Sequence, residues 1–319
     1  MESNLKRCLS YVIPCYCSAK TISSVVDEID LTMRKMSSHF DYEIVLVNDG
    51  SPDNTDVIIS NLARAKKYIT SVNLARNFGQ HAALMAGLKQ TRGDIVVCLD
   101  DDGQTPADEV NKLIDKLDEG YDVVYASYPN KQHSTFRNLG SRLNGKMLVS
   151  MLNKPKDLYV SSYFVARRYV IDEMLRYENC YPYIMGLVLR TTKRICNVPV
   201  NHRDRKEGES GYSLGKLLNL WLNGFTSFSI KPLRMALYFG MVSAVLGFLF
   251  LVYIVINYFL NRGTPLGWSS TTAIILIMSG VILVVLGLIG EYVGRIFMCT
   301  NSTPQYVVRE VIKGNDKDE

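Results

Sequence analysis

Three consecutive carboxylates follow an apolar run in the segment LDDDGQTPADE, residues 99–109. The preceding run, DIVVCL, has the β-branched composition of a buried strand. Asp100, Asp102 and the amide of Gln104 offer oxygen ligands of the kind that Mg²⁺ or Mn²⁺ prefers. Such ions are commonly shared with phosphates. An Asp-rich turn also caps the helix that follows it in many proteins, so both interpretations stay open at this point.

The first half of the chain alternates short β-branched runs with helical stretches. The runs cover residues 9–13, 43–47, 69–73, 94–99 and 122–126, and the stretches 21–36, 54–67 and 79–90 are apolar at helical spacing. Strand and helix in alternation predict a mainly parallel sheet covered by helices on both faces. Ligands bind beyond the carboxyl ends of such strands.

Unusual residues gather at those predicted strand ends. Pro14 and Tyr16 follow the first strand, Asp49 lies in the Asn-Asp-Gly-Ser turn after the second, and the aspartate turn follows the fourth. Neither G-x-x-x-x-G-K-[ST] nor a G-x-G-x-x-G after the first strand is present. A bound phosphate would therefore be held by a metal ion and basic side chains.

Two long segments near the C-terminus contain no charged side chain. They cover residues 235–260 and 263–290 of the 319, and a membrane-spanning helix needs only about 20 apolar residues. We predict two transmembrane helices; the alternative is a pair of central helices in a large soluble core. Lys and Arg flank the pair on the outer sides, which predicts that both ends face the cytoplasm and that the protein is a multi-pass protein of the inner (cytoplasmic) membrane.

These patterns predict four parts. Residues 1–212 form a cytosolic catalytic domain, 213–232 an amphipathic interfacial segment, 233–297 a two-helix transmembrane hairpin, and 298–319 a cytosolic C-terminal tail. The seven cysteines are scattered and lie in a reducing compartment, so we expect free thiols.

Several motifs together resemble one family. VIPCYCSAKTI, VNDGSPDNT, LARNFGQHAALMAGL, LDDDGQTPADE, RKEGESGYS and LGLIGEYVGRI are similar to the family 2 glycosyltransferases that transfer a sugar to polyisoprenyl phosphate. The resemblance covers nearly the whole chain, and GEYVGRI directly after a membrane helix is its most specific part. It implies a GT-A catalytic domain, which is a Rossmann-like α/β fold with a mostly parallel sheet, followed by the interfacial helix and two transmembrane helices.

The resemblance also implies roles for individual residues. Asp100 and Asp102 match the metal-binding pair, with Gln104 as a third metal-site residue, and Asp102 also counts as catalytic. Ser18 stands where the family usually has a nucleotide-contacting Glu. The nucleotide sugar is assigned to Pro14, Tyr16, Ser18, Asp49, Asp100, Asp101 and Arg205.

The acceptor side is expected to be basic. No Asp or Glu occurs from Val123 to Lys156, where six Lys and Arg side chains accumulate. Such a run also fits a solvated face or attraction to anionic lipid. The resemblance favours Arg137 and Ser141 as ligands of the acceptor phosphate and Asp157 as a residue that orients the acceptor or acts as a weak base. An ordinary surface role for Asp157 is the alternative.

The expected reaction is an inverting hexose transfer from a nucleotide sugar, expected to be a UDP-sugar, to undecaprenyl phosphate, with use in cell-envelope glycan modification. The expected partners are this donor, the polyisoprenyl phosphate, the membrane and further copies of the chain in a homo-oligomer such as a tetramer, without nucleic acid. The alternative is a membrane-anchored binding or scaffolding protein that kept the fold and lost transfer. A polysaccharide synthase is disfavoured because two spans are too few to enclose a channel and no Q-x-x-R-W motif occurs.

Overall fold

The computed structural model describes residues 6–128, 154–155, 157–201, 203, 231–260 and 267–314. The chain forms two compact units, one of Met1–Leu217 with Ser302–Glu319 and one of Leu218–Asn301. The C-terminal residues thus belong to the first unit, although the second unit separates them from it in the sequence.

All five strands and all three helices that the sequence predicts are present. The strands are β1 (Arg7–Cys15), β2 (Phe40–Asn48), β3 (Ile69–Leu74), β4 (Ile95–Cys98) and β5 (Val123–Ser127). The helices are α1 (Ile22–Met36), α2 (Thr55–Ala65) and α3 (Gln80–Leu88). After β4 come a short 3₁₀ turn, η1 (Ala107–Glu109), and α4 (Val110–Asp118).

Further elements complete the first unit. They are β6 (Phe164–Arg167), α6 (Arg168–Leu175), α7 (Ile184–Thr191), β7 (Ile195–Pro199) and β8 (Val308–Lys313). The eight strands form one sheet in the order β7-β5-β6-β4-β1-β2-β3-β8. β1 pairs in parallel with β2 and β4, and β2 with β3, whereas β6 and β8 join the sheet in antiparallel direction. The predicted mainly parallel sheet is confirmed at its centre.

Buried side chains of the central strands alternate between the two faces of the sheet. Leu9, Tyr11 and Ile13 of β1 belong to a buried cluster with side chains of α1, α2 and α4. On the other face α3 lies directly on the strands: a Cβ on Gly87 would come within 2.5 Å of the Val12 side chain. Glycine therefore permits the close approach of α3 to the sheet.

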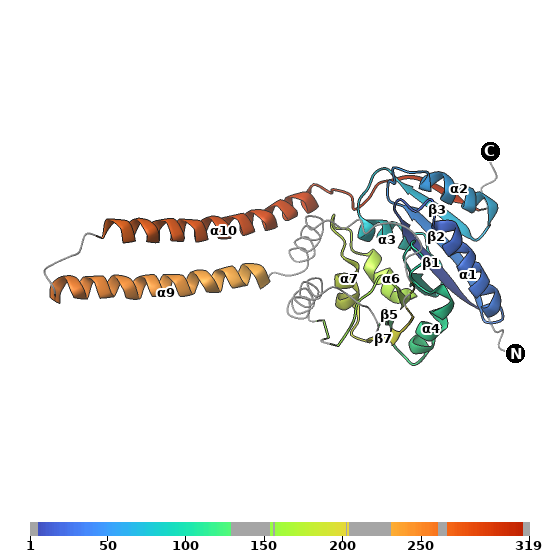
Figure 1. Ribbon diagram of the computed structural model, residues 1–319, viewed down its shortest axis with the longest axis horizontal. Coiled ribbons are helices and arrows are strands. Elements are labelled where there is room, and N and C mark those ends of the chain that lie inside the picture. The colour runs from blue at the N-terminus through green and yellow to red at the C-terminus, as the bar shows by residue number, and fades with distance from the viewer. Residues whose placement is uncertain are drawn as a thin grey trace. The chain divides into compact units, whose positions relative to one another are not determined.

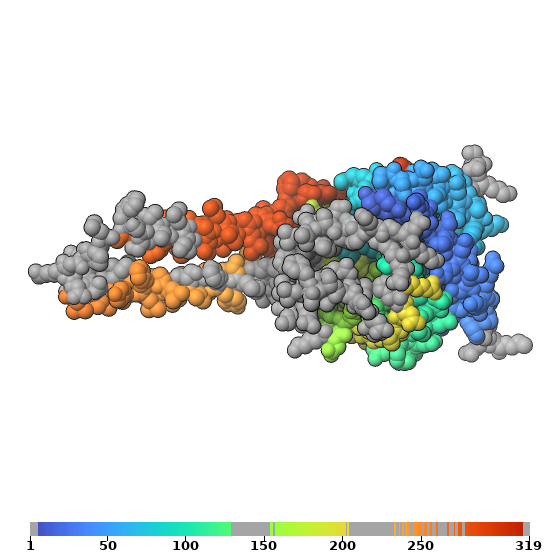
Figure 2. Space-filling model, viewed as in Figure 1, coloured from blue at the N-terminus to red at the C-terminus, as the bar shows by residue number. Residues whose placement is uncertain are grey.

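The second unit contains two long helices that lie side by side, α9 (Lys231–Leu260) and α10 (Trp268–Thr300) (Figures 1 and 2). Many of their large apolar side chains, such as Phe248 and Val284, are exposed. Within the described residues, Met278–Thr300 is long and apolar enough to cross a membrane, and α9 has a shorter apolar run, Gly240–Phe250. The predicted interfacial segment lies largely outside the described residues.

The predicted tail contains an element that the sequence analysis missed. Residues 308–313 form β8, which pairs with β3 at the edge of the catalytic sheet. In the part of the chain that the structure describes, the cysteines form no disulfide bond with one another.

Candidate active site

The carboxyl ends of β1, β2 and β4 bring together the turns that the sequence analysis identified. Cys15, the last residue of β1, pairs with Asn48 at the end of β2, and Val12 pairs with Cys98 at the end of β4. The turn after β1 and the aspartate turn are in direct contact, because the Tyr16 N–H donates to Asp101 Oδ2 over 3.2 Å. The predicted turns therefore lie together at one edge of the sheet.

Asp101, the middle aspartate, joins the turns after β1 and β4. Besides the Tyr16 N–H, its carboxylate accepts a hydrogen bond from the Ser18 hydroxyl. Ser18 is buried, with 2% of its surface exposed. Burial raises the pKa of Asp101, and the bond from Ser18 opposes this shift. The structure thus places Ser18 under the site as a support for Asp101; its predicted contact with the nucleotide stays a prediction.

Asp100 has a raised pKa and two side-chain hydrogen bonds. Its carboxylate accepts hydrogen bonds from Gln80 Nε2, at 3.1 Å, and from the Ser162 hydroxyl. Burial and then the neighbouring charges of Asp102 and Asp101 raise the pKa of Asp100 to about 6. A bound cation would stabilise the ionised form of this buried carboxylate and of its acidic neighbours.

Asp102 and Gln104 complete the turn around Gly103. The Gln104 N–H donates to Asp102 Oδ1 over 3.0 Å, and Gly103 has φ +72°, which favours glycine. The Gln104 carbonyl accepts the N–H of Arg203 over 3.3 Å, so the chain after β7 passes beside this turn. The Arg203 guanidinium is anchored by ion pairs of 2.7 Å with Glu28 and Asp108.

The donor set suits a cation shared with phosphate. In the part of the chain that the structure describes, no three His, Cys, Asp or Glu side chains form a ready metal cluster. Mg²⁺ is usually held by one or two carboxylates together with substrate phosphates and water, so a turn that offers Asp100 and Asp102 fits this kind of site. The hard oxygen donors and the raised pKa of Asp100 support the fit.

Asp49 holds the loop that leads into α3 through backbone hydrogen bonds. Its two carboxylate oxygens accept the backbone N–H groups of Phe78, at 2.7 Å, and Gly79, at 2.9 Å, and only 3% of the residue is exposed. Burial raises the pKa of Asp49, and these two hydrogen bonds oppose the shift. Asp49 thereby fixes the loop that leads into α3 and to Gln80. Contact with the nucleotide stays a prediction.

Gly50 lets that loop lie against the turn after β2. It has φ +60°, and a Cβ there would come within 2.4 Å of the Arg76 backbone. The rest of the turn supports the backbone after β1: Ser51 Oγ accepts the Cys17 N–H, Thr55 Oγ1 accepts the Ser18 N–H and Asp53 Oδ2 accepts the Ala19 N–H, at 3.1, 2.9 and 3.3 Å. Side chains of the segment SPDNT thus hold the backbone that follows β1.

The remaining predicted residues differ in accessibility. Tyr16 is 51% exposed at the site, whereas Pro14 is buried within β1. Asp157 is exposed in the segment before β6, and Ser162, five residues later, is the side chain of this segment that reaches Asp100. Arg137, Ser141 and Arg205 lie outside the described residues. Ser162 and Gln80 were missed because single polar residues in a loop or at a helix start have no sequence pattern of their own.

Two family models match the chain. Residues 10–175 match "Glycosyl transferase family 2", and residues 231–296 match "GtrB C-terminal hairpin". The first match covers the strands and turns of the site, and the second covers most of α9 and α10.

Similar proteins extend over nearly the full length. The undecaprenyl-phosphate 4-deoxy-4-formamido-L-arabinose transferases of Enterobacter sp. (strain 638) and Edwardsiella ictaluri (strain 93-146) are each 35% identical to the chain. The first match covers 95% of the chain and 93% of the relative, and the second covers 98% and 96%.

A solved structure agrees with the fold. Glucosyl-3-phosphoglycerate synthase from Mycobacterium tuberculosis, crystallised with Mn²⁺, UDP-glucose and glycerol 3-phosphate, superposes with a TM-score of 0.50 at 22% identity, over 68% of this chain and 76% of the other. The predicted GT-A-like α/β fold is thereby confirmed. The chain belongs to glycosyl transferase family 2, among the polyisoprenyl-phosphate glycosyltransferases that its motifs predict.

Proposed function

We propose that this enzyme transfers a sugar from a nucleotide diphosphate sugar, preferably a UDP-hexose, to undecaprenyl phosphate. The observation that carries the proposal is the aspartate turn, where Asp100 and Asp102 concentrate negative charge beside the exposed Tyr16. The near full-length similarity to undecaprenyl-phosphate transferases supports the lipid acceptor. The names of these relatives specify a substituted arabinose, so a donor screen has to include pentoses as well as hexoses.

Asp100 and Asp102 would hold Mg²⁺ or Mn²⁺, with the amide of Gln104 as a further ligand. A bound cation stabilises the negative charge that develops on the leaving nucleoside diphosphate. Asp101 holds the backbone of Tyr16, and this supports a role for the exposed Tyr16 ring in packing against the base of the donor. Arg205 stays the predicted contact for the donor phosphates.

The acceptor needs little activation. A phosphate monoester with a second pKa near about 6 is mostly dianionic at neutral pH and can attack the anomeric carbon directly. Asp157 is exposed, which is compatible with a role in orienting the acceptor. Arg137 and Ser141 are the proposed ligands of the lipid phosphate. One displacement inverts the anomeric centre, so an α-linked UDP-hexose would give a β-linked lipid monophosphate sugar and UDP.

The C-terminal helices would form a transmembrane hairpin with both ends in the cytoplasm. The match to the GtrB C-terminal hairpin and the exposed apolar side chains of α9 and α10 support this arrangement. α9 has 30 residues and α10 has 33, and a helix of this length exceeds the roughly 30 Å hydrocarbon core of a bilayer. We propose that the lipid acceptor reaches the active site from the cytoplasmic surface of the membrane that this hairpin would span.

A non-catalytic binding protein is the competing function, because Ser18 replaces the usual Glu. One assay distinguishes the transferase from the binding protein. The full-length protein is supplied with Mn²⁺ and each of a panel of UDP- and GDP-sugars, with and without undecaprenyl phosphate, and release of the nucleoside diphosphate is measured. We expect release from one donor that depends on the lipid. Nucleotide binding without release from any donor would support the binding protein and contradict the transferase.

A further inference from the structure

The last described strand, β8, completes the catalytic sheet from the far end of the sequence. It follows α10 after seven residues and pairs antiparallel with β3, with Asn73 opposite Glu310. The N–H of Ala75 also donates to the Val307 carbonyl over 2.8 Å. β8 is therefore docked along β3 up to the end of that strand.

Four residues form a row across four neighbouring strands. Cys15 of β1 is opposite Asn48 of β2, Asn48 is opposite Asn73 of β3, and Asn73 is opposite Glu310 of β8. Asn48 and Asn73 are only 3% and 1% exposed. Buried amides are costly unless they are hydrogen-bonded, so the partners of these two side chains matter for the geometry of this sheet edge.

The hydrogen bonds along this row have a fixed direction. The Ser51 backbone N–H donates to Asn48 Oδ1 over 3.0 Å, and a backbone N–H can only donate. The Asn48 amide nitrogen is then left to donate to Asn73 Oδ1, which it does over 3.1 Å. Consequently the amide nitrogen of Asn73 also has to donate. The next group in this series of hydrogen bonds, on the side of β8, therefore has to be an acceptor.

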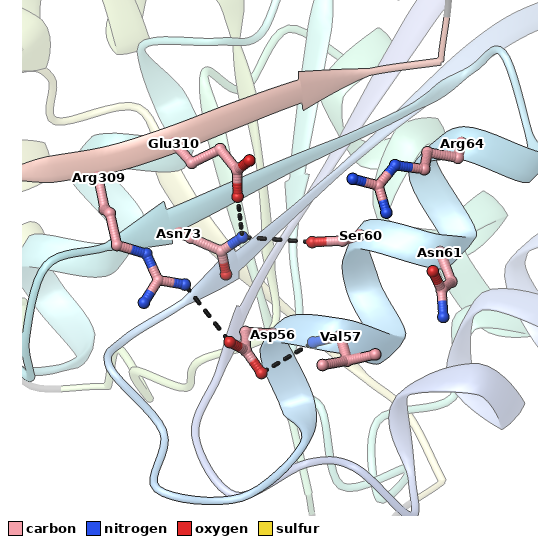
Figure 3. Close-up of a pocket in the computed structure, with 8 residues that line it drawn as sticks. All are labelled: Asp56, Val57, Ser60, Asn61, Arg64, Asn73, Arg309 and Glu310. Carbon is pink, nitrogen blue, oxygen red and sulfur yellow. Dashed lines mark hydrogen bonds and ion pairs between the residues drawn. The ribbon is translucent and has the colours of Figure 1, made fainter. Parts of the chain in front are cut away.

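Ser60 and Glu310 both supply acceptors for this nitrogen. Asn73 Nδ2 donates to Ser60 Oγ over 3.3 Å and lies 3.5 Å from Glu310 Oε2 (Figure 3). An ionised carboxylate has only acceptor oxygens, so it agrees with the direction that Ser51 imposes. These groups line a pocket of about 210 Å³ between α2 and β8, in which Arg309 also reaches Asp56 over 3.4 Å.

The other end of the row enters the candidate active site. Ser51, which donates to Asn48, accepts the Cys17 N–H on its hydroxyl over 3.1 Å. Cys17 has φ +57° and so needs support from its surroundings. The next residue, Ser18, donates to Asp101. Continuous hydrogen bonds thus connect β8 with the backbone under the aspartate turn.

We propose that β8 is a positioning element of the donor site, which acts through Glu310, Asn73 and Asn48 on the backbone of residues 49–51 and of Cys17. The assignment of this site to the sugar donor rests on the proposed function, whereas the hydrogen-bonded connection from β8 to Cys17 does not. The strand that follows the hairpin in the sequence would then be required for donor binding, in addition to closing the edge of the sheet.

Ser71 offers a matched control for side-chain loss in the same strand. It lies two residues before Asn73 on the same face of β3, is fully buried, and its hydroxyl has no hydrogen-bond partner. Removing an unpartnered hydroxyl is expected to be neutral or stabilising. A larger effect of Asn73→Ala than of Ser71→Ala would therefore come from the lost hydrogen bonds of the row and not from the general packing of β3.

The test compares Glu310→Leu, Glu310→Gln, Asn73→Ala and Ser71→Ala in the full-length protein in detergent. Hydrogen–deuterium exchange measures protection of the Ser51 and Cys17 amides, and kinetics measure the KM for the donor and for undecaprenyl phosphate separately. We expect Glu310→Leu to lower protection and raise the donor KM about fivefold, the factor for one lost hydrogen bond, and Asn73→Ala to do so about tenfold or more. The lipid KM should change less than twofold.

Glu310→Gln keeps an acceptor oxygen and should stay near the wild type, as should Ser71→Ala. Unchanged exchange and donor KM in Glu310→Leu and Asn73→Ala would overturn the inference, as would an equal effect of Ser71→Ala or a parallel rise of both KM values. Glu310 is exposed, so its variants are expected to fold. If the wild type transfers no sugar from any donor, the proposed function fails, while the exchange measurement still decides the positioning role.

Discussion

Replacing Asp49 by Asn separates a structural carboxylate from a nucleotide ligand. The Asp49 oxygens accept the N–H groups of Phe78 and Gly79 at 2.7 and 2.9 Å in a buried environment. Asn keeps one acceptor and turns its own NH₂ group toward the other N–H. A hydrogen bond to a charged group contributes about 1.5–3 kcal/mol, and an unsatisfied buried donor costs about 1–3 kcal/mol. Relief from burying a charge offsets part of this, so we expect a loss of about 3 kcal/mol.

A unit of about 200 residues loses roughly 2–4 °C in Tm per kcal/mol, so Asp49→Asn should lower the Tm by about 6–12 °C. Differential scanning fluorimetry of the full-length protein in detergent, at neutral pH and without nucleotide, measures this shift. Asp56→Asn is the matched control, because Asp56 has a 3.4 Å ion pair with Arg309 and both side chains are partly exposed; we expect a loss below about 1 kcal/mol. An unchanged Tm combined with a raised donor KM in Asp49→Asn would refute the structural role.

Three further perturbations test other parts of the account. Asp102→Asn should leave the Tm near that of the wild type and lower transfer about a hundredfold or more, as expected for the loss of a charge stabiliser; full activity in excess EDTA would contradict a metal role. Burial lowers the pKa of His81 to about 4, so the unfolded chain binds more protons below about pH 6.5 and stability should fall by up to about 3 kcal/mol from pH 6.5 to 4. His81→Asn should remove this slope in Tm against pH, and an unchanged slope would argue against the buried neutral imidazole. A cysteine placed at Ser269 should react with an impermeant thiol reagent from outside intact cells while Cys8 and Cys299 do not; labelling of all three, or of none, would contradict the predicted hairpin.

The core of the fold could be predicted because its information is local. The runs that became β1 to β5 are β-branched and the intervening helices have regular apolar spacing, so each element is identified by its own residues. β6 pairs antiparallel with β4 and β5, and β8 lies after the long hairpin and pairs with β3. Their place in the sheet depends on contacts between distant parts of the chain, which the spacing of residues does not encode.

The site was predicted in position and only partly in detail. Aspartates at the ends of parallel strands had to converge, and the bond between Tyr16 and Asp101 agrees with this. The sequence pattern did not predict that the Asp49 carboxylate accepts the backbone N–H of Phe78, because this contact joins residues 29 positions apart. Ser162 reaches Asp100 from a loop whose course the sequence pattern does not predict.

The most direct test of the account is the structure of the reaction product. The purified full-length protein is incubated with undecaprenyl phosphate, Mn²⁺ and the donor that the screen selects, and the lipid product is analysed by mass spectrometry and proton NMR. We predict a lipid monophosphate sugar with inverted anomeric configuration, formed together with the nucleoside diphosphate. A lipid diphosphate sugar with release of the nucleoside monophosphate, or a retained anomeric configuration, would contradict the proposed single displacement at the aspartate turn.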